Sequence, residues 1–429
     1  MKKRVLIITY YWPPSAGSGV QRWLKFSKYL PEFGWEPVIY TPQNPDFDLQ
    51  DESLLEEVSD ETTVLKSTIW EPYQVLDKIR GKKKKHVARI MEQSEKTTLE
   101  KVAIWARANL LIPDPRIFWV KPSVKTLLEK IEELNIDAMI TTGPPHSMHL
   151  IGAKIHDQTG LPWIADFRDP WSEWELWDEL EVRPWALKKH QSLEADVLAN
   201  ANAVTTISQT FKSDLERLSG RKIELLTNGY DPADLPSGFS KKKFKSGGFR
   251  LVYTGIIDSI RNPIPVLRAF KNEFEPTLED VKFTFVGQVS DVVRNFVQMD
   301  DWLSKHVEFP GYFSHEKVFE FYARADVLVL ILTNTKNSKG NIPGKLFEYL
   351  STGVPILALG DSDGDSAKIL KDSGGGEVLA HQDELGIQRA IRRHFLDEEK
   401  TCDKTDLEKF SRKNLTKKLA SILDDCTIS

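Results

Sequence analysis

Short apolar runs recur along the first half of the chain, each followed by a turn and a stretch with helical periodicity. Arg4 to Tyr10 is strand-like, Trp12 to Gly19 forms a loop containing glycines, and Val20 to Leu30 has a helical pattern of apolar positions. This order of strand, turn and helix predicts the start of a parallel α/β sheet. Its later strands are predicted at Glu36 to Thr41, Asp137 to Thr142, Trp163 to Phe167, Ala203 to Ile207 and Ile223 to Leu226.

The pattern starts again after a polar, basic stretch, Ser237 to Gly248, which is typical of a linker. A strand at Arg250 to Tyr253 and a helix around Val266 to Phe274 follow this linker. The later strands of this half are predicted at Lys282 to Val286, Val307 to Phe309, Val327 to Leu332 and Pro355 to Leu359, and the last helix at Leu407 to Leu423. We therefore predict two doubly wound, Rossmann-like domains, residues 1–235 and 236–403, that face each other across a cleft.

The composition of the 429 residues narrows the class of protein. A hydrophobic fraction of 40% and a charged fraction of 28% are ordinary for a globular protein, and the net charge of -5 gives no electrostatic basis for binding nucleic acid. The two cysteines, both near the C-terminus, indicate neither a disulfide framework nor a metal cluster. No apolar run is long enough to cross a bilayer. We expect a cytoplasmic protein.

The segment from Asn341 to Leu359 carries the clearest candidate chemistry. It reads as a short helix that opens at Pro343 and Gly344, with Asn341 as N-cap, and closes at Gly353 before a strand. Free N–H groups at a helix start favour an anion, and Lys345 adds a positive charge beside them. Glu348 lies one turn further along the helix, where its carboxylate can accept hydrogen bonds from a ribose diol. The segment predicts a nucleotide site.

A second cation strengthens this prediction. Gly255 follows the first strand of the second domain, and Arg261 comes shortly after it. If Arg261 and Lys345 face the same space, they bring two positive charges to one diphosphate. A leaving nucleoside diphosphate is where such charges help a transfer reaction most.

Gly17 and Gly19 resemble part of a dinucleotide-binding fingerprint, but Arg22 occupies the place of its third glycine. The second strand ends in Tyr40-Thr41, with no acidic residue to hold a ribose, so a bound NAD-type cofactor is not expected. The two glycines either allow the main chain to approach a phosphate or sugar, or only form a tight turn.

Two further loops follow predicted strands of the first domain. In one, His146 and His149 have no cysteine or glutamate at metal-binding spacing, so we expect no metal; His146 is either catalytic or a structural hydrogen-bonding group. In the other, Asp166, Arg168 and Asp169 can steer sugar hydroxyls or act as acid and base, unless Arg168 and Asp169 form a structural ion pair. The tryptophans after this loop suit sugars, lipid interfaces or core packing.

A basic stretch, Lys78 to Arg89, precedes several large apolar residues. Such a combination can dock a protein on an anionic membrane surface, although a run of lysines is also typical of a solvated loop. The apolar residues are Trp105, Leu110, Leu111, Ile112, Ile117, Phe118 and Trp119.

Over nearly its whole length the chain resembles the GT-B glycosyltransferases, specifically the retaining family 4. The most specific match is the block Pro343-Gly-Lys-Leu-Phe-Glu-Tyr-Leu-Ser-Thr-Gly-Val-Pro. The other matching segments are Val5-Leu-Ile-Ile-Thr-Tyr-Tyr-Trp-Pro-Pro with Gly17 and Gly19, Phe33-Gly-Trp-Glu-Pro-Val-Ile-Tyr, Leu226-Thr-Asn-Gly-Tyr-Asp, Val252-Tyr-Thr-Gly, Phe285-Val-Gly-Gln and Gly311-Tyr-Phe.

The resemblance implies a role for each candidate residue. In the second domain Glu348 would bind the donor ribose, and Arg261 and Lys345, with Gly255 and Gly344, would hold the diphosphate. In the first domain Gly17 and Gly19 would approach the donor, His146 would lie near the transferred sugar, and Asp166, Arg168 and Asp169 would lie near the acceptor. The helix in residues 404–429 would pack back on the first domain. The family pairs two glutamates, and the first would fall at Gly340, so the contact with the donor sugar stays open.

We expect a hexosyltransferase that moves a sugar from a nucleotide-sugar to a glycan or lipid-linked acceptor in cell-surface polysaccharide or glycoconjugate assembly. The resemblance implies retention of anomeric configuration without a metal or other cofactor. Peripheral contact with the inner membrane face would give the basic and aromatic stretch a purpose. Two alternatives stay open: a nucleotide-sugar 2-epimerase of the same fold, and a non-catalytic protein that binds nucleotide-sugars as a partner of another transferase.

Overall fold

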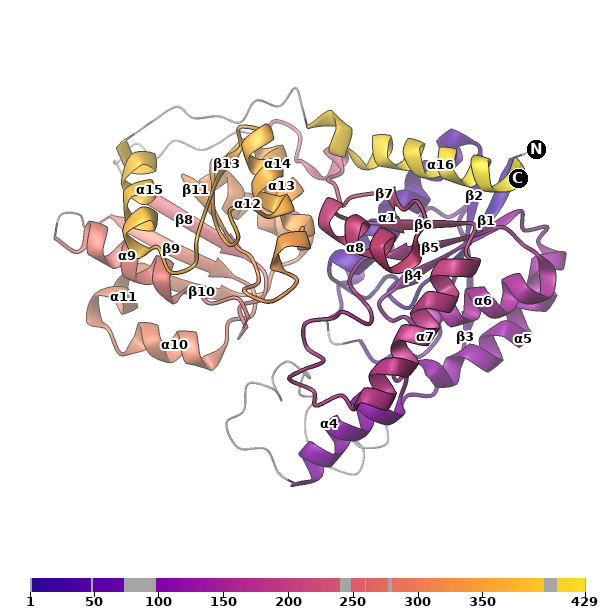
Figure 1. The fold of residues 1–429 in the computed structure, drawn as a ribbon. Coiled ribbons are helices and arrows are strands. Elements are labelled where there is room, and N and C mark those ends of the chain that lie inside the picture. The colour runs from indigo at the N-terminus through magenta and orange to yellow at the C-terminus, as the bar shows by residue number, and fades with distance from the viewer. Residues whose placement is uncertain are drawn as a thin grey trace. The chain divides into compact units, whose positions relative to one another are not determined.

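A computed structural model describes residues 2–47, 49–72, 98–239, 248–258, 260–276, 280–396 and 407–428, which form two compact units (Figure 1). Unit 1 comprises Met1–Thr227 and Arg412–Ser429, and unit 2 comprises Asn228–Ser411. Each unit is a parallel sheet with helices packed on its faces, so the chain has the expected α/β fold class.

Unit 1 contains a seven-stranded parallel sheet in the order β3-β2-β1-β4-β5-β6-β7. The strands are β1 (Lys3–Ile8), β2 (Trp35–Pro42), β3 (Thr63–Ser67), β4 (Ala138–Gly143), β5 (Trp163–Phe167), β6 (Ala203–Thr206) and β7 (Glu224–Leu225). The helices are α1 (Ser18–Tyr29), α4 (Thr98–Leu110), α5 (Ile117–Glu133), α6 (Ser147–Thr159), α7 (Pro184–Asn200), α8 (Gln209–Ser219) and α16 (Arg412–Ile428).

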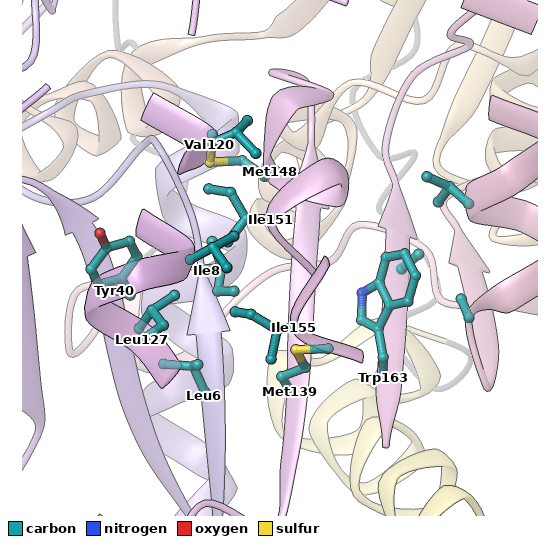
Figure 2. Packing of buried hydrophobic residues seen from close by; sticks show 14 of the residues in the cluster. Leu6, Ile8, Tyr40, Val120, Leu127, Met139, Met148, Ile151, Ile155 and Trp163 are labelled. Atoms are coloured by element: carbon teal, nitrogen blue, oxygen red, sulfur yellow. The ribbon is translucent and has the colours of Figure 1, made fainter. Parts of the chain in front are cut away.

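Both faces of this sheet are buried, because successive residues of a strand point to opposite sides and both sides meet helices. In β1, Leu6 and Ile8 pack with α5 and α6, while Val5 and Ile7 pack with α1 and α16. The C-terminal helix α16 therefore belongs to the core of unit 1. Figure 2 shows side chains of the first face pointing toward one another, among them Leu6, Ile8, Leu127, Met139, Ile151 and Ile155.

Unit 2 contains a six-stranded parallel sheet in the order β10-β9-β8-β11-β12-β13. The strands are β8 (Phe249–Thr254), β9 (Val281–Val286), β10 (Val307–Gly311), β11 (Val327–Ile331), β12 (Ile356–Leu359) and β13 (Gly376–Leu379). The helices are α9 (Ile264–Phe274), α10 (Asp291–Gln298), α11 (Asp301–His306), α12 (His315–Arg324), α13 (Gly344–Thr352), α14 (Asp365–Asp372) and α15 (Glu384–Leu396). Helices α9 and α15 pack on one face, and α12, α13 and α14 pack on the other.

Three local predictions need correction. The strands β3 and β13 were not predicted; both are edge strands with partly exposed residues, so neither has the continuous apolar run of a buried strand. The last helix begins at Arg412 instead of Leu407, because Glu408–Phe410 forms a separate 3₁₀ turn and Ser411 is extended.

In both sheets the strand order reverses beside the first strand, between β1 and β4 in unit 1 and between β8 and β11 in unit 2. The loops that leave two such neighbouring strands run in opposite directions, and this is where open parallel sheets bind ligands. Gly17 and His146 follow β1 and β4, and Gly255 and Gly344 follow β8 and β11. The fold places these predicted site residues in the loops and at the helix start that follow the strands at the switch point of each sheet.

Candidate functional site

Helix α13 forms one side of the candidate site in unit 2. It runs from Gly344 to Thr352 and ends at Gly353, whose φ of 73° is left-handed, as expected from the sequence. The predicted N-cap was wrong: Pro343 is the N-cap in extended conformation, and the Asn341 amide instead donates to Thr333 Oγ1 at 3.3 Å. The first N–H groups of α13 still have no acceptor within the helix, which suits an anion.

Lys345 lies against the carboxyl end of β8. Its Nζ donates to the Thr254 carbonyl at 2.6 Å and to the Tyr253 hydroxyl at 3.3 Å, and it lies 4.6 Å from the centre of the Tyr253 ring. Burial, followed by the positive charge of Arg261, lowers the pKa of Lys345 to about 7. The lysine therefore changes its charge near neutral pH.

The close contact between Lys345 and the end of β8 requires a glycine at position 255. Its φ is +116°, and a Cβ built on it would lie within 2.2 Å of Lys345 Nζ. Any larger residue would both strain the backbone and displace the ammonium group. The predicted glycine and lysine are therefore brought together by the fold.

Arg261 forms a 2.6 Å ion pair with Asp258 in the loop that follows β8. Its positive charge still acts on Lys345, so both predicted cations lie within electrostatic range of each other. Sequence reasoning missed Asp258. An acidic residue three positions before an arginine is a common surface pattern, and only the fold shows that it faces the candidate site.

Glu348 lies one turn beyond Lys345, and its side chain is 23% exposed. His315 Nε2 lies 3.3 Å from Glu348 Oε1, and the Tyr322 hydroxyl donates to Oε2 at 3.5 Å. The hydroxyl groups of Tyr322 and Tyr349 in turn meet at Thr254 Oγ1, at 3.1 and 3.0 Å. No sequence pattern indicated His315, Tyr322 or Tyr349, since each is brought to Glu348 or Thr254 by packing between helices and β8.

In unit 1 the start of α1 joins the loop after β5. Gly17 is the N-cap of α1 with φ +110° and open space around its Cβ position. A Cβ on Gly19 would lie 2.5 Å from Arg168 Nη1, and Arg168 also donates to the Pro144 carbonyl. This corner combines a helix start with a guanidinium group, an arrangement that favours an anion.

His146 is the N-cap residue of α6 and is 8% exposed. Its ring stacks on Trp171 at 4.6 Å and 5°, and its buried Nδ1 has no hydrogen-bond partner among the described residues. Burial, with nearby His149, His190 and Arg168, lowers the pKa of His146 well below its ordinary value. The imidazole is therefore neutral at physiological pH, which suits a hydrogen-bonding group better than a cationic acid.

Asp166 is fully buried and ionised in an ion pair with Arg22. Arg22 Nη2 lies 2.7 Å from Oδ1 and Nε lies 3.1 Å from Oδ2, and Thr142 and Thr205 also donate to the carboxylate at 3.0 and 2.8 Å. Burial would raise the pKa of Asp166, but the charge and hydrogen bonds of Arg22 hold it below its ordinary value. These contacts give the carboxylate a structural role, and a part in chemistry stays a prediction.

The other residues of the loop after β5 differ in their burial and in their contacts. Arg168 donates to the Pro144 carbonyl, and Asp169 is exposed. Asp166 forms a buried ion pair with Arg22 at this strand end. Trp171 is buried against His146, which makes it a core residue. The predictions for Arg168 and Asp169 near an acceptor stay predictions.

The candidate membrane surface is only partly described. The whole basic stretch 78–89 lies outside the described residues. Trp119 is fully buried and stacks on Tyr40, so its assignment to an exposed surface was wrong, but Phe118 is 45% exposed and contacts Trp70, which is 53% exposed. Within the described ranges, no helix has the length and apolar character needed to span a membrane, and no three His, Cys, Asp or Glu residues are grouped to bind a metal.

Residues 248–397 match the protein family described as Glycosyl transferases group 1. This stretch lies within unit 2 and contains Gly255, Arg261, Lys345 and Glu348. No curated protein is similar enough in sequence to count as a relative of this chain.

Solved structures share the fold over almost the whole chain. Anabaena HepE in complex with UDP and glucose has a TM-score of 0.64 at 14% identity, covering 99% of this chain and 100% of its own. A variant of S. aureus TarM in complex with fondaparinux, alpha-GlcNAc-glycerol and UDP has 0.62 at 11% identity, covering 98% and 100%. WaaG, a glycosyltransferase involved in lipopolysaccharide biosynthesis, has 0.54 at 13% identity, covering 99% and 95%. The chain has the two-domain fold of the GT-B glycosyltransferases.

Proposed function

We propose that the chain is a glycosyltransferase that transfers a hexose from a nucleotide-sugar to a glycan or lipid-linked acceptor, because residues 248–397 match the family described as Glycosyl transferases group 1. The observation that carries this proposal is the placement of Lys345, Arg261 and Glu348 around the end of β8. Two cations and a helix start suit a diphosphate, and a partly exposed carboxylate one turn away suits a ribose diol. HepE and TarM, which share the fold, are both complexed with UDP.

The transfer itself needs charge stabilisation on the leaving diphosphate. In our proposal the bond between the sugar C1 and the phosphate oxygen breaks, and a bond from C1 to an acceptor oxygen forms on the same face. The acceptor hydroxyl gives its proton to the departing phosphate oxygen, so no metal or other cofactor is required. Lys345 and Arg261 stabilise the charge that develops on the phosphate.

In this proposal unit 1 contacts the transferred sugar and the acceptor. His146, neutral and held against Trp171, offers a hydrogen bond to a hydroxyl of the transferred sugar, and Arg168 beside Gly19 offers positive charge to an anionic group of the acceptor. Neither side chain needs to change its charge during the reaction. WaaG, which shares the fold, is a glycosyltransferase involved in lipopolysaccharide biosynthesis, and this supports an acceptor in cell-surface glycan assembly.

The donor assignment is tested by nucleotide binding. Thermal unfolding of the wild type is measured with UDP, GDP, ADP, CMP and dTDP and then with the sugar derivative of each nucleotide. One nucleotide and its sugar derivative should raise the unfolding temperature. Glu348→Ala should abolish this shift without lowering the unfolding temperature of the free protein. An undiminished shift in the variant removes Glu348 from the nucleotide site. Conversion of a nucleotide-sugar without acceptor would favour the 2-epimerase instead.

In our proposal the protein reaches its acceptor by docking on the cytoplasmic face of a membrane. Trp70 and Phe118 form an exposed aromatic pair, with ring centroids 4.8 Å apart, which suits the interfacial layer of a bilayer. Trp70→Ser with Phe118→Ser should reduce co-sedimentation with vesicles containing anionic phosphatidylglycerol. The matched control is Trp185→Ser, since Trp185 is also exposed, at 54%, but belongs to α7. Equal sedimentation of all variants would contradict membrane docking through this pair.

A further inference from the structure

The carboxylate of Glu348 is held from two sides by one helix. His315 and Tyr322 both belong to α12 and are seven positions apart, so they lie on the same face of that helix. His315 Nε2 lies 3.3 Å from Oε1, and the Tyr322 hydroxyl lies 3.5 Å from Oε2. Each carboxylate oxygen therefore has its own hydrogen-bonding neighbour.

We propose that His315 and Tyr322 are positioning residues that fix the Glu348 carboxylate for the ribose diol of the donor. This inference rests on the proposed function, in which Glu348 contacts the ribose. A carboxylate has about four lone-pair sites, and these two contacts occupy one on each oxygen of Glu348. A glutamate that is already oriented loses less side-chain freedom when the nucleotide binds.

Both residues of this pair have further contacts of their own. Tyr322 is 1% exposed, and its hydroxyl also meets Thr254 Oγ1 at 3.1 Å. The ring of His315 packs edge-on against Phe319, with centroids 5.6 Å apart. The side chains of His315 and Glu348 are 21% and 23% exposed, so both are partly accessible to solvent. The two contacts therefore hold Glu348 without fully burying its side chain.

Thr254 joins this arrangement to the phosphate side. Its carbonyl accepts from Lys345 Nζ at 2.6 Å, while its hydroxyl contacts Tyr322 and Tyr349. The cation for the diphosphate and the carboxylate for the ribose thus share one residue at the end of β8. The spacing between the two contacts is set by the protein before a nucleotide arrives.

The experiment compares UDP with 2′,3′-dideoxy-UDP by calorimetry, and GDP with its dideoxy form in parallel. The ratio of the two dissociation constants measures recognition of the diol alone, and a smaller folded fraction affects both ligands equally. Wild type should prefer the ribose form, and Glu348→Gln should lose most of that preference. His315→Ala and Tyr322→Phe should each reduce the ratio roughly 3- to 10-fold, and His315→Asn, which keeps an N–H donor, should restore part of it.

A double substitution separates positioning from a general structural effect. In the Glu348→Gln background, His315→Ala should not change the ratio further, because there is no carboxylate left to orient. The matched control is His394→Ala, which removes another histidine–glutamate pair among the described residues of unit 2, at 3.9 Å from Glu377 on the edge strand β13. This control should keep the wild-type ratio.

The possible failures differ. If Glu348→Gln loses the preference while His315→Ala and Tyr322→Phe both keep it, the positioning role is wrong and the proposed function stands. If no nucleotide of the thermal screen binds the wild type, or if Glu348→Gln keeps the preference, the ribose contact of the proposed function is wrong and the positioning role falls with it. Additive losses from His315→Ala and Glu348→Gln also overturn positioning through Glu348.

Discussion

The affinity for a nucleotide-sugar should fall as the pH rises through neutrality, because Lys345 loses its charge there. The pKa of this lysine is lowered to about 7, first by burial and then by the charge of Arg261. Its ammonium form, which a diphosphate needs, therefore predominates below about pH 7 and becomes scarce above it. An ordinary lysine would stay charged throughout this range.

The size of the effect follows from the fraction of charged lysine. With a pKa of about 7, the ammonium form is about nine-tenths of the total at about pH 6 and about one-hundredth at about pH 9. If only this form takes the diphosphate, the apparent dissociation constant rises by roughly a hundredfold between these values. A bound diphosphate raises the pKa of Lys345, because its negative charge favours the ammonium form of the lysine.

Calorimetry with UDP-glucose, or with the nucleotide-sugar that the thermal screen selects, measures this dependence. A nucleotide-sugar is preferable to a free diphosphate because its phosphates are diesters with no proton to lose in this range. Lys345→Met should bind weakly with little change over pH, and Lys345→Arg should bind with a flat profile because arginine stays charged. His315→Asn is measured alongside, since His315 is a titratable group facing Glu348. A wild-type slope retained in Lys345→Met would refute the reasoning.

Two further substitutions test the structural basis of the sites. Gly255→Ala should destabilise the protein by about 1–3 kcal/mol in urea unfolding and remove nucleotide binding, because the residue has positive φ and its Cβ would meet Lys345 Nζ. Gly311 has φ +91° but no atom within 4 Å of a Cβ built on it. Gly311→Ala should therefore lower the free energy of unfolding through backbone strain but keep nucleotide binding. Asp166→Asn should lower the free energy of unfolding by about 3–5 kcal/mol, since it leaves Arg22 buried without its counter-charge. Asp157→Asn, at an exposed position on α6, should change it by less than about 0.5 kcal/mol. A catalytic loss in Asp166→Asn without lost stability would contradict the structural role. In the wild type, the contribution of the Asp166 ion pair should be present above the ordinary carboxyl pKa and be lost as the pH falls through the depressed pKa of Asp166.

Local patterns predicted much of the fold. The buried strands β5 and β11 were predicted within one residue of their observed ends, since each is a short apolar run bounded by turns. The helix that closes at Gly353 was predicted because glycine adopts the left-handed conformation at a helix end at low cost. The edge strands β3 and β13 were missed because pairing with a neighbouring strand, more than their own composition, makes them strands.

The sequence by itself determined the alternation of strands and helices apart from the edge strands β3 and β13, the glycines at the strand ends and the presence of Lys345 and Glu348 on one short helix, because these depend on residues close together in the chain. The tertiary structure decided which side chains meet. Arg22 and Asp166 are 144 positions apart, Lys345 reaches the Thr254 carbonyl across 91 positions, and His315 meets Glu348 across 33. Burial and charge at these contacts lower the pKa of Lys345 and keep Asp166 ionised. Such effects depend on desolvation and distance in the folded chain, which local residue patterns do not contain.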